Sequence, residues 1–177
     1  MRALVVFESM FGNTQAIAEA VADGLATCME VDLAEVGTAA DVVRDDIDLL
    51  LVGGPTHAFG LSRPKTRRDA VDRSRRGVVS AGVGLREWLD SLRDVPRGTA
   101  AAAFDTRADK PRLPGAASRA AHKRLLRLGF RVVAPPQSFY VAGMTGPLVA
   151  GEEDRARQWA ERLGSVAAQQ EPRRQAS

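Results

Sequence analysis

Residues 8–14 carry the groups in this chain that are best suited to bind an anion. They read Glu-Ser-Met-Phe-Gly-Asn-Thr, directly after the apolar run Ala3–Phe7, and they open a helical pattern. A strand that passes through a short loop into a helix points several backbone N–H groups, and the positive end of the helix dipole, at one place. Ser9, Asn13 and Thr14 add side-chain donors. The segment therefore predicts a phosphate site.

The segment differs from the common nucleotide motifs. It does not read G-x-x-x-x-G-K-[ST], which excludes a nucleotide-hydrolysing P-loop, and it lacks the spaced glycines of a dinucleotide fingerprint. No Lys or Arg lies between Arg2 and Arg44, so neutral donors would hold the phosphate of a ligand that is bound and kept. No His, Cys or carboxylate pair has metal-ligand spacing, and no G-x-S-x-G elbow occurs, so neither a metal nor a serine hydrolase is expected.

The elements that must position this segment alternate between strands and helices. Strands are expected at Arg2–Phe7, Glu30–Val36, Ile47–Val52 and Thr99–Phe104, and a last strand at Arg131–Ala134 and Ser138–Val141 is interrupted by Pro135 and Pro136. Helices are expected at Asn13–Leu25, Arg86–Leu92, Ala116–Leu128 and Glu152–Ala167. This pattern is typical of an α/β protein whose parallel sheet has helices on both faces. One domain is expected over residues 1–168, with a flexible tail over 169–177.

The character of the strands predicts their order in the sheet. The first, third and fourth strands are uniformly apolar, so both of their faces should be covered. The second strand alternates polar and apolar residues, and the last contains prolines, which places both at edges. The order 2-1-3-4-5 satisfies these constraints. A ligand then binds beyond the strand ends at the switch point, where the loops are 8–14, 53–62 and 104–115.

Three motifs at these loops carry a resemblance to a known family. They are Ser9–Thr14, Gly53–His57 (Gly-Gly-Pro-Thr-His) and, more weakly, Phe104–Arg107 (Phe-Asp-Thr-Arg). On these residues the chain resembles the flavodoxin family over roughly residues 1–168. The resemblance implies a flavodoxin-like three-layer sandwich with a five-stranded sheet and a tightly held FMN. It implies an electron carrier or, as the alternative, a small FMN-dependent NAD(P)H or quinone reductase.

The resemblance also implies which residues bind the cofactor; it assigns no catalytic residue. Around the FMN phosphate they are Ser9, Met10, Phe11, Gly12, Asn13 and Thr14, and around the isoalloxazine ring Pro55, Thr56, His57, Ala58, Phe59, Gly60, Phe104, Asp105, Thr106 and Arg107. The hydroxyls of Thr56 and Thr106 would donate to the ribityl chain or the ring edge. Gly60, or else Ala58, would let a peptide turn and donate to the reduced flavin N5, which shifts the redox potentials.

The chain departs from the best-known electron-carrier flavodoxins in three respects. Position 11 is Phe where many members have a hydroxyl residue, so its amide must serve the phosphate. Phe59 is the only ring in the second loop, and the third loop has no Tyr. The pI is about 9.6, whereas carrier flavodoxins are acidic. These departures favour a reductase or a carrier with acidic partners, while the domain size favours the carrier.

Composition bounds the remaining possibilities. The 177 residues are 45% hydrophobic with a net charge of +3, which predicts a folded domain. No stretch approaches the roughly 20 apolar residues of a membrane helix, and no cationic-then-apolar leader is visible. Lone Cys28 fits a reducing compartment and is expected to be a small buried hydrophobe. We therefore expect a cytoplasmic protein without membrane insertion.

Two groups of cations stand out, at residues 63–76 and 107–131. The simplest interpretation of both is a solvated face, and His122 in the second group is expected on such a face. Beside a flavin, the first group could instead steer an anionic redox partner or the phosphates of NADPH. Neither group interleaves aromatic residues with its charges, so no nucleic-acid partner is expected.

The connection over residues 55–80 is too long for an ordinary loop. Ser62 as a cap, a Pro soon after it and Gly77 at the end predict a short helix that packs weakly, because only Ala70 and Val71 are apolar contacts. Before this connection, His57 either responds to flavin protonation through its pKa, which is normally near 6.5, or contributes only backbone.

Two further functions share the predicted fold. A receiver-like signalling module needs acidic residues at the end of the first strand and an Asp after the third. Here Glu8 is expected to be isolated, and the third strand ends at Gly53–Pro55. A flavin-free interaction domain would keep the same sheet and bind no cofactor.

Overall fold

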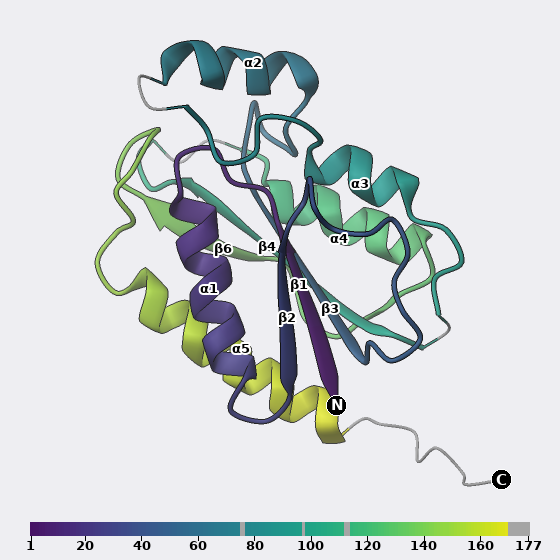
Figure 1. Cartoon of the computed structure of the whole chain (residues 1–177). Coiled ribbons are helices and arrows are strands. Elements are labelled where there is room, and N and C mark those ends of the chain that lie inside the picture. Colours follow the sequence, from purple (N-terminus) through teal and green to yellow (C-terminus); the bar gives the residue numbers. More distant parts are fainter. Residues whose placement is uncertain (75–76, 97, 112–113, 170–177) are drawn as a thin grey trace, which may run out of the picture.

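The computed structural model describes residues 1–74, 77–96, 98–111 and 114–169. A parallel sheet forms its centre (Figure 1). Its strands are β1 (Arg2–Phe7), β2 (Glu30–Glu35), β3 (Leu49–Pro55), β4 (Ala100–Ala108), β5 (Arg131–Val132) and β6 (Gln137–Val141). The order is β2-β1-β3-β4-β5, with β6 paired to β4, which confirms the predicted order 2-1-3-4-5.

Strands β5 and β6 together occupy the last position of the sheet. Strand β5 pairs with Ala100 and Ala101 at the start of β4, and β6 pairs with Phe104–Ala108 at its end. The residues between them include Pro135 and Pro136, and a proline cannot donate to a strand ladder. The interruption of the last strand is therefore confirmed, and it gives the sheet six strand segments.

Helices cover both faces of the sheet and so form three layers (Figure 1). Helices α1 (Asn13–Leu25) and α5 (Glu152–Gln169) lie on one face. Helices α3 (Leu85–Ser91) and α4 (Ala117–Arg127) lie on the other. Helix α2 (Pro64–Arg73) lies apart from both layers, above the carboxyl ends of the strands (Figure 1).

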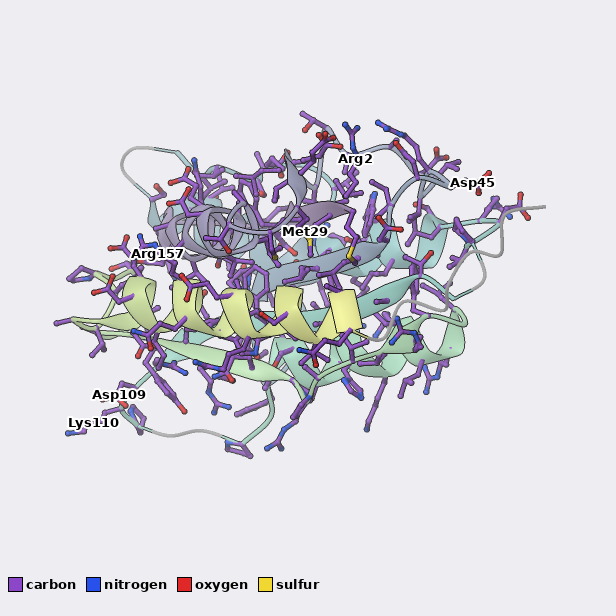
Figure 2. The ribbon with its side chains drawn as sticks, turned by 90° about the horizontal axis from the view of Figure 1, so that it is seen from below. Arg2, Met29, Asp45, Asp109, Lys110 and Arg157 are labelled. Carbon is purple, nitrogen blue, oxygen red and sulfur yellow. The ribbon has the colours of Figure 1, made fainter. Side chains whose placement is uncertain are left out.

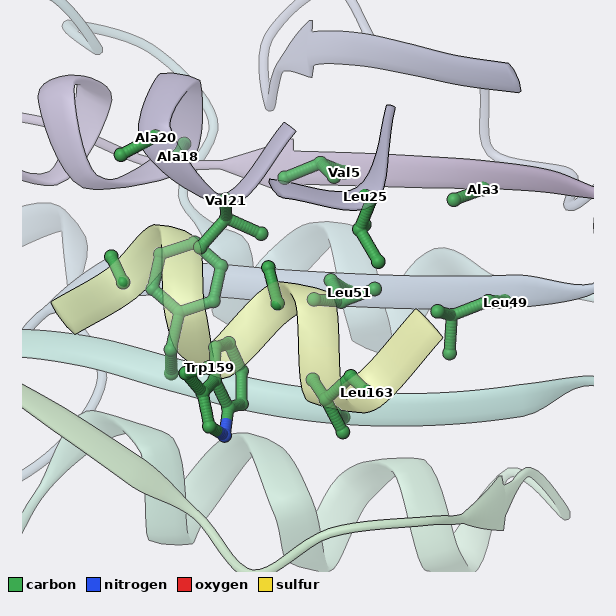
Figure 3. Packing of buried hydrophobic residues seen from close by; sticks show 14 of the residues in the cluster. Ala3, Val5, Ala18, Ala20, Val21, Leu25, Leu49, Leu51, Trp159 and Leu163 are labelled. Carbon is green, nitrogen blue, oxygen red and sulfur yellow. The ribbon is translucent and has the colours of Figure 1, made fainter. Parts of the chain in front are cut away.

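The α1–α5 face has a continuous apolar core. Figure 3 shows Val21 and Leu25 of α1 facing Leu51 of the sheet, with Trp159 of α5 in the same layer. The Trp159 ring packs edge-on against Phe104, with centroids 6.1 Å apart. The two helices cross so closely at Gly24 that a Cβ there would lie 2.4 Å from the Arg157 carbonyl oxygen. Only glycine allows this approach.

Two strands extend further than the sequence predicts. Strand β3 continues through Gly53 and Gly54 to Pro55, and β4 continues to Ala108. The residues Phe104–Arg107 thus belong to a strand, which corrects their assignment to a loop. They are polar beyond Phe104, yet they stay in the sheet because β3 pairs with them on one side and β6 on the other.

Two single-residue predictions are wrong. Cys28 is exposed, because it follows α1 in the turn that leads to β2. His122 is half-buried, and its Nδ1 is buried without a partner among the described residues. The expected tail falls mainly on residues 170–177, which lie outside the described part of the chain. None of the helices that the structure describes combines the length and apolar character needed to span a bilayer.

Candidate functional site

The 9–14 loop connects β1 to α1 at the predicted switch point. Gly12 is the N-cap residue of α1, with φ of 88°, and as a glycine it offers no side-chain cap. The Ser9 hydroxyl accepts hydrogen bonds from Gly12 N at 3.1 Å and Gln15 N at 3.3 Å. These bonds curl the loop around Ser9 and direct the first turn of α1 toward one point.

Four backbone N–H groups of this loop remain available for a ligand. Within the described part of the chain, the amides of Met10, Phe11, Asn13 and Thr14 have no hydrogen-bond partner. Unpaired N–H groups at the start of a helix add to the positive end of its dipole. The arrangement suits an anion with several oxygen acceptors, such as a phosphate.

The side chains of the loop are bound to the protein itself. Thr14 Oγ1 lies 2.7 Å from Thr106 Oγ1 on β4, and Asn13 Nδ2 donates to the Thr145 carbonyl at 3.0 Å. Two of these residues nevertheless keep a proton for a ligand: the Ser9 hydroxyl accepts twice and still has its own hydrogen, and the Asn13 amide has a second. These contacts fix the loop, and the role of its side chains toward a phosphate stays a prediction.

Residues 79 and 80 support the 9–14 loop from outside, which the sequence did not indicate. Val79 N donates to the Met10 carbonyl at 3.0 Å, and Ser80 N donates to the Ser9 carbonyl at 2.8 Å. In return Ser9 N donates to Ser80 Oγ at 3.0 Å, and Ser80 Oγ donates to Glu35 at 2.6 Å. Because the partners lie about 70 positions apart, no local pattern could have revealed them.

The second predicted segment ends in a tight turn at residues 57–60. His57 and Gly60 exchange two backbone hydrogen bonds, of 2.8 and 2.9 Å. The residues between them, Ala58 and Phe59, have φ of 42° and 73°. Left-handed backbone costs a residue with a Cβ about 1 kcal/mol. The turn thus has its left-handed backbone at Ala58 and Phe59, and not at Gly60. Phe59 is also 56% exposed.

The third predicted segment, Phe104–Arg107, is largely enclosed by the protein, because β3 and β6 pair with its backbone. Phe104 is fully buried, its ring directed into the apolar core against Phe139 and Trp159. Asp105 is also fully buried, and its Oδ2 accepts from Ser118 N at 2.8 Å. Burial raises the pKa of the Asp105 carboxyl, and the Ser118 hydrogen bonds oppose this rise.

Asp105 and Thr56 together cap helix α4. Thr56 Oγ1 accepts from Ala117 N at 2.9 Å, next to the Asp105–Ser118 bond. The α4 N-cap residue, Ala116, has no side-chain oxygen, so two neighbouring strand ends supply the acceptors instead. The sequence assigned both residues to the cofactor, and capping is an additional role that it missed.

A recess of about 480 Å³ lies beside the 9–14 loop. It is lined by Phe11, Gly12 and Asn13 on one side and by the stretch Pro147–Glu153 on the other. This stretch follows a turn in which Ala142 N donates to the Pro147 carbonyl at 2.8 Å. It enters the site only through tertiary structure, and the sequence did not assign it.

The environment of Glu8 and of the first cationic group corrects two predictions. Glu8 is fully buried and accepts hydrogen bonds from the Ser62 hydroxyl and from Leu85 N. Ser62 is therefore not the cap of α2, whose N-cap position is Arg63. Within the group, Arg67 is buried rather than solvated, while Arg75 and Arg76 lie outside the described residues.

Solved structures of known proteins share this architecture. A flavodoxin from the domain Archaea matches with a TM-score of 0.62 and 18% identity, covering 95% of this chain and 99% of that one. Oxidised Flavodoxin 1 from Bacillus cereus matches with a TM-score of 0.64 and 17% identity, over 97% and 99% of the two chains. A flavodoxin from Streptococcus pneumonia matches with a TM-score of 0.65 and 21% identity, covering 93% of this chain and 99% of that one. The chain has a flavodoxin-like fold.

The same flavodoxin-like fold occurs within longer proteins. The rubredoxin oxygen:oxidoreductase of Desulfovibrio gigas matches with a TM-score of 0.62 and 15% identity, and this chain covers 36% of its length. No family model and no curated protein sequence matches the chain. The similarity is thus one of fold.

Proposed function

We propose that this protein binds FMN and transfers electrons through it, as a flavodoxin-type electron carrier. The observation that carries the proposal is the set of four amides at the start of α1, those of Met10, Phe11, Asn13 and Thr14, which have no hydrogen-bond partner among the described residues. They lie at the topological switch point of a flavodoxin-like sheet, which is where such folds bind ligands. FMN carries the monophosphate that this site suits.

Each part of the site has a role in this proposal. The four amides and the remaining proton of Ser9 bind the phosphate. The backbone of Pro55–Gly60 flanks the ring, together with Arg107, the residue of Phe104–Arg107 that is not buried. The exposed Phe59 ring is available to stack on one flavin face. Bound flavin supplies one- and two-electron redox chemistry, and the protein supplies orientation and electrostatics.

The charge distribution supports a partner with an acidic surface. Residues 62–136 contain 18 Lys and Arg against 7 Asp and Glu, whereas residues 1–61 contain 2 against 10. Figure 2 shows Asp45, from the acidic part, and Lys110, from the basic part, on opposite sides of the molecule. Such an asymmetry orients a charged partner during encounter. Either an acidic redox protein or the phosphates of NAD(P)H would meet the basic part.

The alternative function is a small FMN-dependent NAD(P)H or quinone reductase. The observation that favours it is the thin aromatic cover: Phe59 is the only Phe, Tyr or Trp in the 57–60 turn, and β4 contributes no Tyr beside it. A flavin face without a ring is open to a hydride donor or a quinone. The same basic surface would then attract the phosphates of NADPH.

An absorption spectrum tests the proposal. The purified protein, mixed with FMN and passed through a gel-filtration column, should retain visible flavin absorbance at about one FMN per chain. Anaerobic reduction then separates the two functions. A spectrum that stays at the one-electron level over part of the titration supports the carrier, and rapid bleaching by NADPH supports the reductase. A colourless protein that ignores FMN would leave the flavin-free interaction domain.

A further inference from the structure

Helix α2 lacks the apolar attachment that holds the other helices. Only Arg67 and Ala70 are buried along its length, and Val71 is 39% exposed. Ala70 belongs to neither apolar core. The helix nevertheless lies at the carboxyl ends of the strands (Figure 1), and it directly follows the 57–60 turn in sequence. Some other interaction must hold it there.

The guanidinium of Arg67 is the attachment that comes from within the helix. Arg86 of α3 also holds the segment before the helix, because it donates to the Leu61 and Ser62 carbonyls at 2.9 and 3.1 Å. Arg67 Nη1 donates to Ser62 Oγ at 2.8 Å and lies 3.0 Å from Glu87 Oε2 on α3. The Ser62 hydroxyl donates in turn to Glu8 Oε1, and Glu8 Oε2 accepts from Leu85 N at 2.8 Å. A single cation thus connects α2 with the end of β1 and with the start of α3.

The Arg67 guanidinium fits closely against Gly84, where there is no room for a side chain. A Cβ on Gly84 would lie 2.2 Å from Arg67 Nη1, and only 2.8 Å from Ser62 Oγ and Glu87 Oε2. The Arg67 residue is 5% exposed, so its charge has little contact with water and depends on these partners. Arg67 therefore occupies a defined niche, unlike its neighbour Arg68, which is exposed.

The niche lies between the two segments assigned to the cofactor. On one side, Glu8 directly precedes Ser9 and the 9–14 loop. On the other side His57, the first residue of the 57–60 turn, faces α2, where it interacts with the Thr66 backbone. Burial and the positive charge of Arg67 lower the His57 pKa, and the hydrogen bond with the Thr66 backbone opposes this fall. Both segments are therefore in reach of the same guanidinium.

We propose that Arg67 is the positioning residue of the cofactor cleft. Through Ser62 and Glu8 it holds α2 and the 57–60 turn at a fixed spacing from the 9–14 loop, so the cleft has its binding shape before any ligand arrives. Pre-organisation of this kind raises affinity because ordering is not needed on binding. The cofactor part of this inference rests on the proposed function, whereas the attachment of α2 does not.

The test compares Arg67→Met with Arg68→Met, a matched change one residue along the same helix. In the apoprotein, amide hydrogen exchange over residues 57–74 should be faster by about tenfold or more in R67M, which corresponds to about 1.4 kcal/mol of opening free energy, and unchanged in R68M. The FMN dissociation constant should rise by at least about tenfold in R67M only. Arg67→Lys should fall between R67M and wild type, because it keeps the charge and loses the planar fork.

Each outcome decides the inference. If R67M folds, and both its amide hydrogen exchange and its FMN affinity equal those of the wild type, Arg67 has no positioning role. If the wild type itself ignores FMN, the proposed function fails, and the exchange measurement alone still decides whether Arg67 holds α2. If R67M does not fold, Glu87→Gln removes one partner of the ion pair. It should accelerate exchange over residues 57–74, and unchanged exchange in E87Q would overturn the inference.

Discussion

Helices α1 and α2 both approach the cofactor loops, but they are held in opposite ways. Helix α1 buries an apolar stripe that includes Ile17, Val21 and Leu25, and it packs on the sheet and on α5. Helix α2 buries little apolar surface and is fixed by the guanidinium of Arg67. The first mode spreads the attachment over many apolar contacts. The second depends on a few polar contacts, which also include the Arg86 hydrogen bonds to the Leu61 and Ser62 carbonyls, so we expect α2 to open without unfolding the domain.

The largest expected effect is on the apolar side of this comparison. Ile17→Ala removes a fully buried side chain from the α1 core, and such truncations cost about 2–5 kcal/mol of unfolding free energy. The matched change on α2, Val71→Ala, should cost less than about 0.5 kcal/mol, because Val71 is exposed. Urea unfolding of the apoproteins measures both. Equal losses in the two variants would show that α2 also has an apolar attachment.

The second prediction concerns the polar attachment of α2 through the Arg67 guanidinium. Gly84→Ala places a methyl group in the niche of the Arg67 guanidinium, which must then move. We expect a loss of about 1–3 kcal/mol, the usual cost of overpacking, and faster amide exchange in α2. Gly82→Ala is the control, since a Cβ at that exposed position meets no atom within 4 Å. A neutral G84A variant would contradict the fit of this niche.

Helix α4 combines the two modes: it packs on the apolar core, and the buried Asp105 carboxyl caps its start. Burial raises the Asp105 pKa, so the folded protein binds this proton more tightly than the unfolded chain. Stability should therefore fall as the pH rises from the unfolded pKa, near 3.8, through the raised folded value, by up to about 1.4 kcal/mol per pH unit.

Asp105→Asn should remove this fall, since the Asn amide oxygen still accepts from Ser118 N and has no charge. Urea unfolding of wild type and D105N between pH 4 and 7 measures the difference. Burial also raises the pKa of Glu8, but that carboxyl is present in both proteins and cancels. Identical pH profiles would mean that Asp105 is ionised in the folded protein without cost.

The smallest expected effect concerns the other half of the same cap. Thr56→Val keeps the shape of the side chain and removes the oxygen that accepts from Ala117 N. We expect a loss of about 1 kcal/mol, as for other helix caps. Thermal unfolding of the apoprotein measures it, with Thr145→Val as the control, because Thr145 is exposed and its hydroxyl has no hydrogen-bond partner among the described residues. No loss in T56V would place the cap of α4 entirely on Asp105.

The comparison also explains how much the sequence could predict. Apolar periodicity predicted α1, and the strand character predicted the order of the sheet, because burial leaves a local pattern. The attachment of α2 left none: Glu8 and Ser62 are 54 positions apart, and the guanidinium of Arg67 looks like any surface cation in the sequence. Asp105 and Thr56 were noticed as polar residues at strand ends, but their shared partner α4 is visible only in the fold.

Calorimetric titration of the apoprotein with FMN and with riboflavin tests the central claim most directly. The two ligands share the ring and the ribityl chain, and they differ in the phosphate that the 9–14 loop is proposed to bind. We expect FMN to bind at one site per chain and at least about tenfold more tightly than riboflavin. Equal affinities would place the phosphate elsewhere, and the absence of heat with FMN would contradict the proposed function.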